Sequence, residues 1–168
     1  MPAGERLLVD TNVLLEATDE RRNHHGDAKR LIESSAHLVL TAQVIREYLA
    51  VTTRPTDANG LGMDTADALA NVREFRRRLG LLPEEKPILP IFLQLLEAIP
   101  CRGKRVHDAH IVATAMAHKV STIVSLNGDD LSPFVPRVEV MTPAQALDSR
   151  DGSGRRPAPR RRRPPIRS

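Results

Sequence analysis

Short apolar runs alternate with longer stretches of helical periodicity along most of the chain. The apolar runs are typical of buried strands and lie at residues 6–10, 37–41, 121–127 and 138–141. Apolar residues spaced three and four positions apart predict helices at residues 26–36, 42–53, 63–80, the second half of 88–99, and 107–119. A helix is also expected directly after Asp10 and at residues 142–147, with Thr142 as N-cap and Pro143 at the first helical position. Strands separated by helices predict an α/β fold with a mostly parallel sheet covered on both faces.

Length and composition favour one domain in a reducing compartment. The 168 residues are enough for one compact core and few for two. Cys101 is the one cysteine, which excludes an internal disulfide and a cysteine-based zinc cluster. The N-terminus lacks the pattern of a signal peptide, and residues 88–100 are interrupted by Gln94, Glu97 and prolines. We therefore expect a soluble, cytoplasmic protein with no membrane association.

Positive charge is concentrated at the C-terminus. Residues 148–168 contain eight Arg and two Asp, so residues 1–147 carry a formal charge of −2 although the whole chain carries +4. The same segment is rich in Pro and poor in apolar residues, so we expect one folded domain at 1–147 followed by a disordered basic tail at 148–168. The tail is either an arm that attracts nucleic acid or a solvated extension without a specific role.

Two carboxylates occupy positions where a buried face is expected. Asp10 follows the apolar triplet at residues 7–9, at the carboxyl end of the predicted strand, where ligands gather in open α/β sheets. Asp108 falls within the apolar stripe of its helix, together with Ile111 and Val112. A buried carboxylate needs a partner or a metal ion. Asp108 could alternatively cap its helix.

Two further carboxylate positions come from other elements. Glu47 lies on the flank of the apolar face of helix 42–53, where it is either functional or a solvated boundary residue. Asp129 and Asp130 follow the strand at 121–127, where aspartate is also common in turns. Four elements thus bring acids towards strand ends, and such a cluster needs a cation to stay ionised. Oxygen ligands favour Mg²⁺ or Mn²⁺.

The segments "LLVDTNVLL", "VIREYLAV", "RVHDAHIVATAMAHKV" and "STIVSLNGDDL" resemble the PIN-domain ribonucleases, and among them the VapC-like toxins of type II toxin–antitoxin pairs. The resemblance spans about Arg6 to Leu147 and excludes the tail. It implies a three-layer α/β/α fold with a mostly parallel central sheet of four to five strands. It also implies hydrolysis of RNA phosphodiester bonds with 3′-hydroxyl and 5′-phosphate products, a VapB-like antitoxin as partner, and a homodimer.

The resemblance also implies a set of site residues. It places the four catalytic, metal-binding acids at Asp10, Glu47, Asp108 and Asp130. Asp129 competes with Asp130 for the fourth position. The supporting residues that it implies are Thr11, Asn12, Ser125, Asn127 and Asp129. Ser125 replaces the usual threonine and keeps a hydroxyl, and Leu131 replaces the usual phenylalanine and keeps an apolar anchor.

Other functions stay open at this point. A housekeeping RNA-processing PIN nuclease and a non-hydrolytic, Mg²⁺-binding receiver-like or nucleotide-binding domain would share the α/β pattern. The chain lacks the GxxxxGK[S/T], GxGxxG and DxDxT motifs. Aromatic residues are scarce, which speaks against a dedicated single-strand binding module. Helices 63–82 and 88–99 carry more apolar residues than a thin core should absorb, so they either pack on one another or offer a groove to a partner helix.

Overall fold

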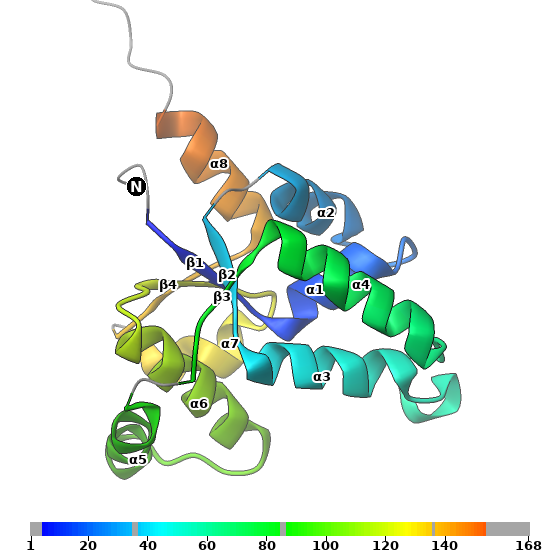
Figure 1. Cartoon of the computed structure of the whole chain (residues 1–168). Coiled ribbons are helices and arrows are strands. Elements are labelled where there is room, and N and C mark those ends of the chain that lie inside the picture. Colours follow the sequence, from blue (N-terminus) through cyan, green and yellow to red (C-terminus); the bar gives the residue numbers. More distant parts are fainter. Residues whose placement is uncertain (1–4, 35–36, 85–86, 136, 154–168) are drawn as a thin grey trace, which may run out of the picture.

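A computed structural model describes residues 5–34, 37–84, 87–135 and 137–153 (Figure 1). Of these, residues 151–153 are described by their backbone alone. Five strands form one sheet in the order β3-β2-β1-β4-β5, and every neighbouring pair is parallel. The strands are β1 (Leu7–Val9), β2 (Leu38–Leu40), β3 (Gly80–Leu81), β4 (Thr122–Val124) and β5 (Glu139–Met141). The predicted α/β class and parallel sheet are confirmed.

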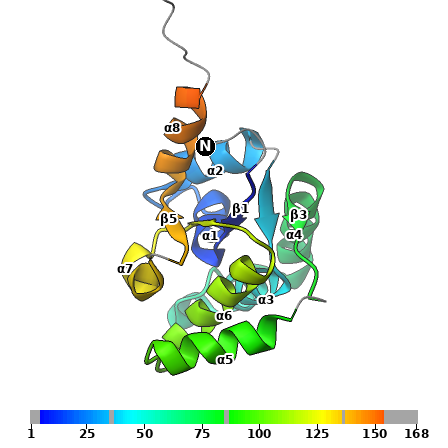
Figure 2. The ribbon, with the colours of Figure 1, turned by 90° about the vertical axis from the view of Figure 1, so that its left-hand side faces the viewer.

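Helices cover both faces of this sheet. They are α1 (Thr11–Thr18), α2 (His25–Ser34), α3 (Ala42–Thr53), α4 (Thr65–Arg78), α5 (Ile88–Ala98), α6 (Lys104–Ala117), α7 (Gly128–Leu131) and α8 (Pro143–Ser153). Helices α5 and α6 pack on each other, whereas α2 packs on α1 and α8 (Figure 2). The chain moves outward from β1 to β2 and β3, then crosses to β4 and β5 on the other side of β1. Right-handed crossovers in opposite directions place their helices on opposite faces, which gives three layers.

The crossing creates the position of the site. The strand order reverses between β1 and β4, so the loops after these two strands diverge to opposite faces and leave a crevice at the carboxyl edge of the sheet. Residues of β1 and β4 are fully buried, which fixes this edge within the core. Asp10 and Ser125 directly follow β1 and β4, respectively.

Three sequence predictions need correction. Strand β3 was not predicted, because two residues at a sheet edge leave no recognisable apolar run. Helix α5 is helical from Ile88, not only in its second half, with Pro90 inside the first turn where no backbone donor is needed. Helix α8 continues to Ser153, beyond the predicted end of the domain at residue 147. The rest of the predicted tail, residues 154–168, lies outside the described residues.

Helix α8 begins as its sequence predicts. The Gln145 backbone N–H donates to Thr142 Oγ1 at 3.2 Å, and the Thr142 N–H donates to Gln145 Oε1 at 2.9 Å. This is a capping box, which satisfies two donors at the start of the helix.

Within the described residues, no helix has the length and apolar character needed to cross a membrane.

Tyr48 anchors α3, the helix that carries Glu47. Its side chain is fully buried, and its ring meets Phe75 of α4 edge-to-face with centroids 5.3 Å apart. The Thr18 hydroxyl donates to the Leu14 carbonyl, so the Tyr48 hydroxyl donates to Thr18 Oγ1 at 2.9 Å and accepts from Asn71 Nδ2 at 3.0 Å. One hydroxyl thus ties α1, α3 and α4 together.

We predict that Tyr48→Phe lowers the free energy of unfolding by about 1–2 kcal/mol, because it removes two hydrogen bonds and leaves the Asn71 amide without its acceptor. Chemical denaturation of wild type and variant measures the difference. An unchanged denaturation midpoint would show that the hydroxyl does not hold α3 in place.

Candidate active site

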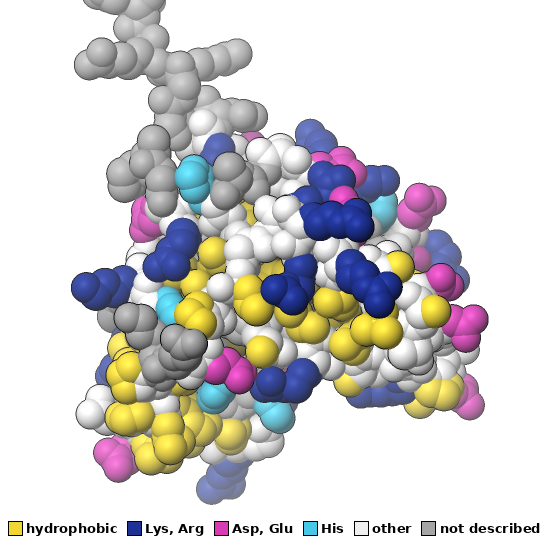
Figure 3. Space-filling model, viewed as in Figure 1, with side chains coloured by type: hydrophobic (Ala, Val, Ile, Leu, Met, Phe, Trp, Pro, Cys, Tyr) yellow, Lys and Arg dark blue, Asp and Glu magenta, His cyan; other side chains and the backbone are white. Residues whose placement is uncertain are grey.

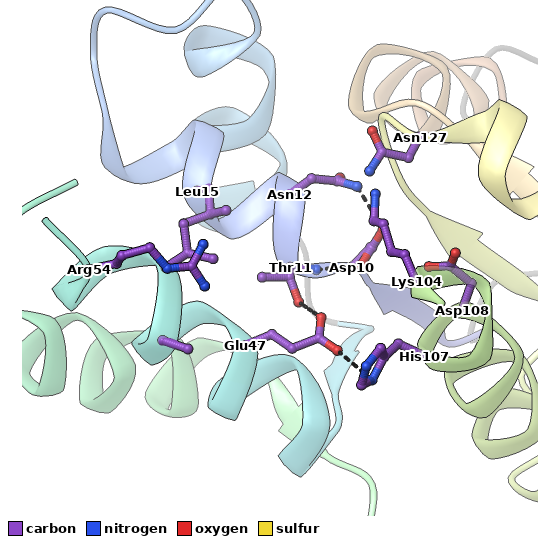
Figure 4. Close-up of a pocket in the computed structure, with 12 residues that line it drawn as sticks. Asp10, Thr11, Asn12, Leu15, Glu47, Arg54, Lys104, His107, Asp108 and Asn127 are labelled. Carbon is purple, nitrogen blue, oxygen red and sulfur yellow. Dashed lines mark hydrogen bonds and ion pairs between the residues drawn. The ribbon is translucent and has the colours of Figure 1, made fainter. Parts of the chain in front are cut away.

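A cavity of about 520 Å³ opens at the carboxyl edge of the sheet, at the reversal point between β1 and β4. Three of the four predicted acids line it, namely Asp10, Glu47 and Asp108, and they come from three different elements (Figure 4). The predicted supporting residues Thr11, Asn12 and Asn127 line it as well. The fold therefore brings together side chains that are up to 117 positions apart in the sequence.

Asp10 is held by donors from both sides of the reversal point. Its Oδ1 accepts from the Thr11 backbone N–H at 2.7 Å, and its Oδ2 accepts from Asn12 Nδ2 at 2.7 Å and from the Ser125 hydroxyl at 2.7 Å. Burial nevertheless raises the pKa of Asp10 above its usual value, with the nearby Glu47 adding to the rise and the hydrogen bonds opposing it. The carboxylate is therefore fixed in orientation and costly to keep charged.

Asn12 and Ser125 join the loops after β1 and β4. Asn12 Nδ2 also donates to Ser125 Oγ at 3.0 Å, and Asn12 Oδ1 accepts from the Leu126 N–H at 3.0 Å. Ser125 Oγ accepts in turn from the Asn127 N–H at 3.0 Å. The Ser125 hydroxyl thus donates one hydrogen bond and accepts two, and Ser125 is buried.

Glu47 reaches the cavity from α3. Its Oε2 accepts from the Thr11 hydroxyl at 3.0 Å, and its Oε1 accepts from Gln43 Nε2 at 2.8 Å. Gln43 also donates to the His107 carbonyl at 3.1 Å, which connects α3 to α6. The His107 ring lies at the edge of the site, with Nδ1 4.0 Å from Glu47 Oε1.

Asp108 differs from the other two acids in the cavity. Its Oδ2 is buried and has no hydrogen-bond partner within the described part of the chain. Burial raises the pKa of Asp108, Lys104 counteracts the rise, and the surrounding acids Asp130, Asp10 and Glu47 add to it. The capping interpretation fails for Asp108, because α6 begins four residues earlier, at Lys104. A buried oxygen without a partner is a position for an external ligand.

Asp130 and Asp129 lie outside this cavity. They line a smaller adjoining cavity of about 360 Å³, which shares only Asn127 with the first. Lys104 Nζ lies 2.9 Å from Asp130 Oδ2, and this contact lowers the pKa of Asp130 and raises that of Lys104. Leu131 is buried, in keeping with its expected role as an apolar anchor.

Sequence reasoning missed three residues that shape the cavity. Lys104 lies one helical turn before Asp108 and so faces the same side of α6, and Gln43 has the same relation to Glu47 on α3. Spacing of i and i+4 around each acid would have identified both. Arg54 lines the cavity from the end of α3, opposite Lys104, and its position two helical turns after Glu47 places it on the same face of the helix (Figure 4).

The donor set fits a hard divalent cation in its chemistry. Asp10, Glu47 and Asp108 offer carboxylate oxygens, including the unpartnered Asp108 Oδ2, at one cavity. Among the described residues, no three acidic, histidine or cysteine side chains already converge closely enough to hold a metal ion. Mg²⁺ is commonly held by one or two carboxylates and several waters, a mode of binding that does not require three converging side chains.

Comparisons with known proteins relate most of this chain to one family. The PIN domain family model matches residues 7–132. Over 126 residues, the chain is 30% identical to Ribonuclease VapC48 of Mycobacterium tuberculosis, which covers 71% of this chain and 86% of that protein.

Solved structures show the same fold at lower identity. DNA-bound VapBC from Salmonella typhimurium matches with a TM-score of 0.62 at 15% identity, covering 83% of this chain and 98% of that chain. VapC20 of Mycobacterium tuberculosis, a sarcin–ricin loop cleaving toxin, matches with a TM-score of 0.56 at 17% identity, covering 79% of this chain and 98% of that chain. Because the family model spans well over half of the sequence, this chain belongs to the PIN-domain family.

Proposed function

We propose that this protein is a divalent-metal-dependent endoribonuclease and the toxin of a VapBC-type toxin–antitoxin pair. The observation that carries the proposal is that Asp10, Glu47 and Asp108 line one cavity, where a buried Asp108 oxygen has no hydrogen-bond partner among the described residues. Membership of the PIN family and the 30% identity to Ribonuclease VapC48 support the same activity.

Asp10, Asp108 and Glu47 would hold Mg²⁺ or Mn²⁺, with Asp130 as the fourth acid. When bound, the cation makes a coordinated water more acidic and offsets charge that develops at the phosphate. Asp130 is the better fourth acid than Asp129, because its contact with Lys104 connects it to the helix that carries Asp108.

The protein's own residues prepare the site for this chemistry. Asn12 and Ser125 keep the Asp10 carboxylate in one orientation, and Thr11 and Gln43 do the same for Glu47. The positively charged side chains of Lys104 and Arg54 lie on opposite sides of the acids (Figure 4). They would attract an RNA phosphate into a cavity that is otherwise negatively charged.

We predict that Asp108→Asn and Asp10→Asn each reduce RNA cleavage by more than about 100-fold, because each removes a metal-binding charge. Cleavage of an end-labelled RNA with Mg²⁺, and its loss in EDTA, measures the effect. Asp67→Asn is the matched control and should retain most of the activity, because Asp67 is exposed on α4 and lines neither the acid cavity nor the adjoining ones. Full activity in both cavity variants would refute the site.

Asp108 should also make stability depend on pH. Its pKa is raised in the folded chain, so in the window above the ordinary carboxyl pKa the folded state binds more protons than the unfolded state. Stability contributed by this group therefore falls as pH rises through that window. We predict that, without metal, Asp108→Asn unfolds at a higher temperature than wild type at neutral pH, and that the difference vanishes in acid.

Asp130→Asn provides a control in which the expected change in stability has the opposite sign to that of Asp108→Asn. Lys104 lowers the pKa of Asp130, so this pair stabilises the fold at neutral pH and loses its contribution as pH falls through the lowered pKa. The pair is solvent-exposed, so Asp130→Asn should lower the melting temperature only slightly. Thermal melts of the three proteins across pH measure both effects, and a destabilised Asp108→Asn variant at neutral pH would contradict the analysis.

Exposed apolar side chains support a protein partner. Among the residues whose side chains the structure describes, five large hydrophobic ones are exposed, and four of them, Leu69, Leu81, Leu89 and Leu93, fall in the two segments expected to be too apolar for the core. Figure 3 shows apolar side chains gathered over α5. We propose that these surfaces serve a VapB-like antitoxin and a homodimer contact in the cytoplasm.

We predict that expression of this chain alone arrests bacterial growth, and that Asp108→Asn relieves the arrest because it removes the nuclease. Co-expression of the small protein encoded beside it should also relieve the arrest, through a complex that co-purifies. Growth curves and affinity purification measure these outcomes. Normal growth with an active wild-type enzyme would instead favour a housekeeping nuclease.

The arginines after residue 153 remain a proposal based on sequence. Seven of the eight arginines counted in the predicted tail lie at 155–167, outside the described residues. Such a segment would add sequence-independent attraction to RNA phosphates and make RNA affinity more sensitive to salt.

A further inference from the structure

A second cavity adjoins the acid cavity. It has a volume of about 310 Å³ and is lined by Phe92, His110, Arg46, Gln43 and Val106, together with Glu47 and His107. Glu47 and His107 line the first cavity as well, so these two side chains form the wall between the two (Figure 4). We propose that this second cavity binds a nucleobase of the RNA next to the phosphodiester bond that is cut, an inference that rests on the proposed ribonuclease function.

Phe92 is the aromatic ring that makes this cavity suitable for a base. The chain has four Phe and Tyr residues, and three of them, Tyr48, Phe75 and Phe134, are buried in the core. Phe92 is half-buried and lines the second cavity, beside the acids. Its ring meets the His110 imidazole edge-to-face with centroids 5.3 Å apart, an arrangement that fixes the ring while it stays accessible. Bases of single-stranded RNA stack on such rings.

Some polar side chains of the second cavity are held by several hydrogen bonds, whereas others can turn towards a ligand. Gln43 Nε2 already donates to Glu47 and to the His107 carbonyl, and Gln43 Oε1 lies 2.6 Å from His110 Nδ1. With both amide hydrogens used, Gln43 Oε1 accepts from His110, and Gln43 acts as a rigid part of the wall. Arg46 differs, because its contact with Glu84 is a solvent-exposed ion pair at 3.4 Å.

An exposed ion pair is weak, so the Arg46 guanidinium can exchange Glu84 for a ligand at little cost. A guanidinium provides donors and a flat face, which suit the acceptor edge or the ring of a base. An aliphatic side chain of a protein partner would use neither property, and it would leave the Arg46 and His107 polar groups desolvated without partners. The lining therefore favours a planar, hydrogen-bonding ring.

The position of the cavity fits the same occupant. A base is connected to its phosphate through one sugar, so a phosphate among Asp10, Glu47 and Asp108 places a flanking base one step away, across the Glu47–His107 wall. Stacking on Phe92 would then fix the strand relative to the acids, which favours cleavage next to a particular nucleotide.

The test combines protein variants with RNA that lacks single bases. The substrate is an oligoribonucleotide that the wild-type protein cuts at one mapped bond, together with versions carrying an abasic residue on either side of that bond. The variants are Phe92→Leu, which removes the ring, and Phe92→Tyr, which keeps it. Gln94→Ala is the matched control, because Gln94 also lies on α5, is exposed, is not part of the apolar surface and does not line the cavity.

We expect Phe92→Leu to raise KM for intact RNA by about tenfold with little change in kcat, whereas Phe92→Tyr and Gln94→Ala stay near wild type. An abasic residue on one side of the bond should raise KM for wild type by a similar factor and have no further effect in Phe92→Leu. This non-additivity identifies the base and the ring as one contact.

Three results would overturn the inference. If the losses from Phe92→Leu and from each abasic residue simply multiply, the cavity does not hold a base. If Phe92→Leu leaves RNA kinetics unchanged but weakens the complex with the co-purified partner, the cavity holds a protein side chain. If wild-type protein with Mg²⁺ or Mn²⁺ cuts no RNA, the proposed function itself fails, and the inference falls with it.

Discussion

The cost of holding like charges together in a buried crevice governs how this protein is built. Asp10 lies where two loops diverge, the position that opens a cavity in a doubly wound sheet, and burial there penalises its charged form. Donors from Thr11, Asn12 and Ser125 offset part of that penalty. Because the last two connect the ends of β1 and β4, the same bonds also set the width of the crevice. The electrostatic demand and the geometry of the site are therefore met by one cluster.

The acids of the site differ in how many hydrogen-bond donors or positive charges offset their negative charge. Glu47 has two donors and Asp130 has a lysine, but Asp108 Oδ2 has no partner in the described residues. Lys104 counteracts the raised pKa of Asp108 from the same helix, yet its Nζ is bonded to Asp130 instead. A fold that satisfies its polar groups elsewhere and leaves this oxygen bare keeps a place for a ligand. A divalent cation is the ligand whose charge would remove the repulsion.

How much the sequence predicts depends on the range of the interaction involved. Periodicity predicts β1, β2 and β4, because each is a short apolar run that is buried along its whole length. It also predicts β5, which is only partly buried, from the short run at residues 138–141. It misses β3, whose two exposed residues are strand only through pairing with β2.

The end of the domain is also set by contacts between segments that are far apart in the sequence. Composition suggests that the chain becomes disordered at residue 148, but α8 packs on α2 and continues to Ser153. Local patterns therefore identify elements with their own apolar face, whereas elements that depend on a distant neighbour are not visible in one sequence.

The same distinction separates the site residues. Asp10 and Asp108 stand out because a carboxylate in an apolar run or stripe conflicts with its surroundings. Gln43 and Arg54 do not conflict with anything nearby in the sequence. Their spacing places them on the same face of α3 as Glu47, but the contacts that they make are decided only when α3 packs beside α6. Asp130 matched the family pattern, but its engagement by Lys104 outside the main cavity required the packing of α7 against α6.

Gln43 lines the second cavity and fixes the residues that separate it from the acid cavity. Its amide bonds to Glu47, the His107 carbonyl and His110, so it fixes α3 against α6 along the wall that the cavities share. Because α5 packs on α6, the position of Phe92 relative to the acids is set through the same contact. A nuclease that recognises a nucleotide must hold base and phosphate at a fixed separation, and here one buried amide bridges the two helices that determine it.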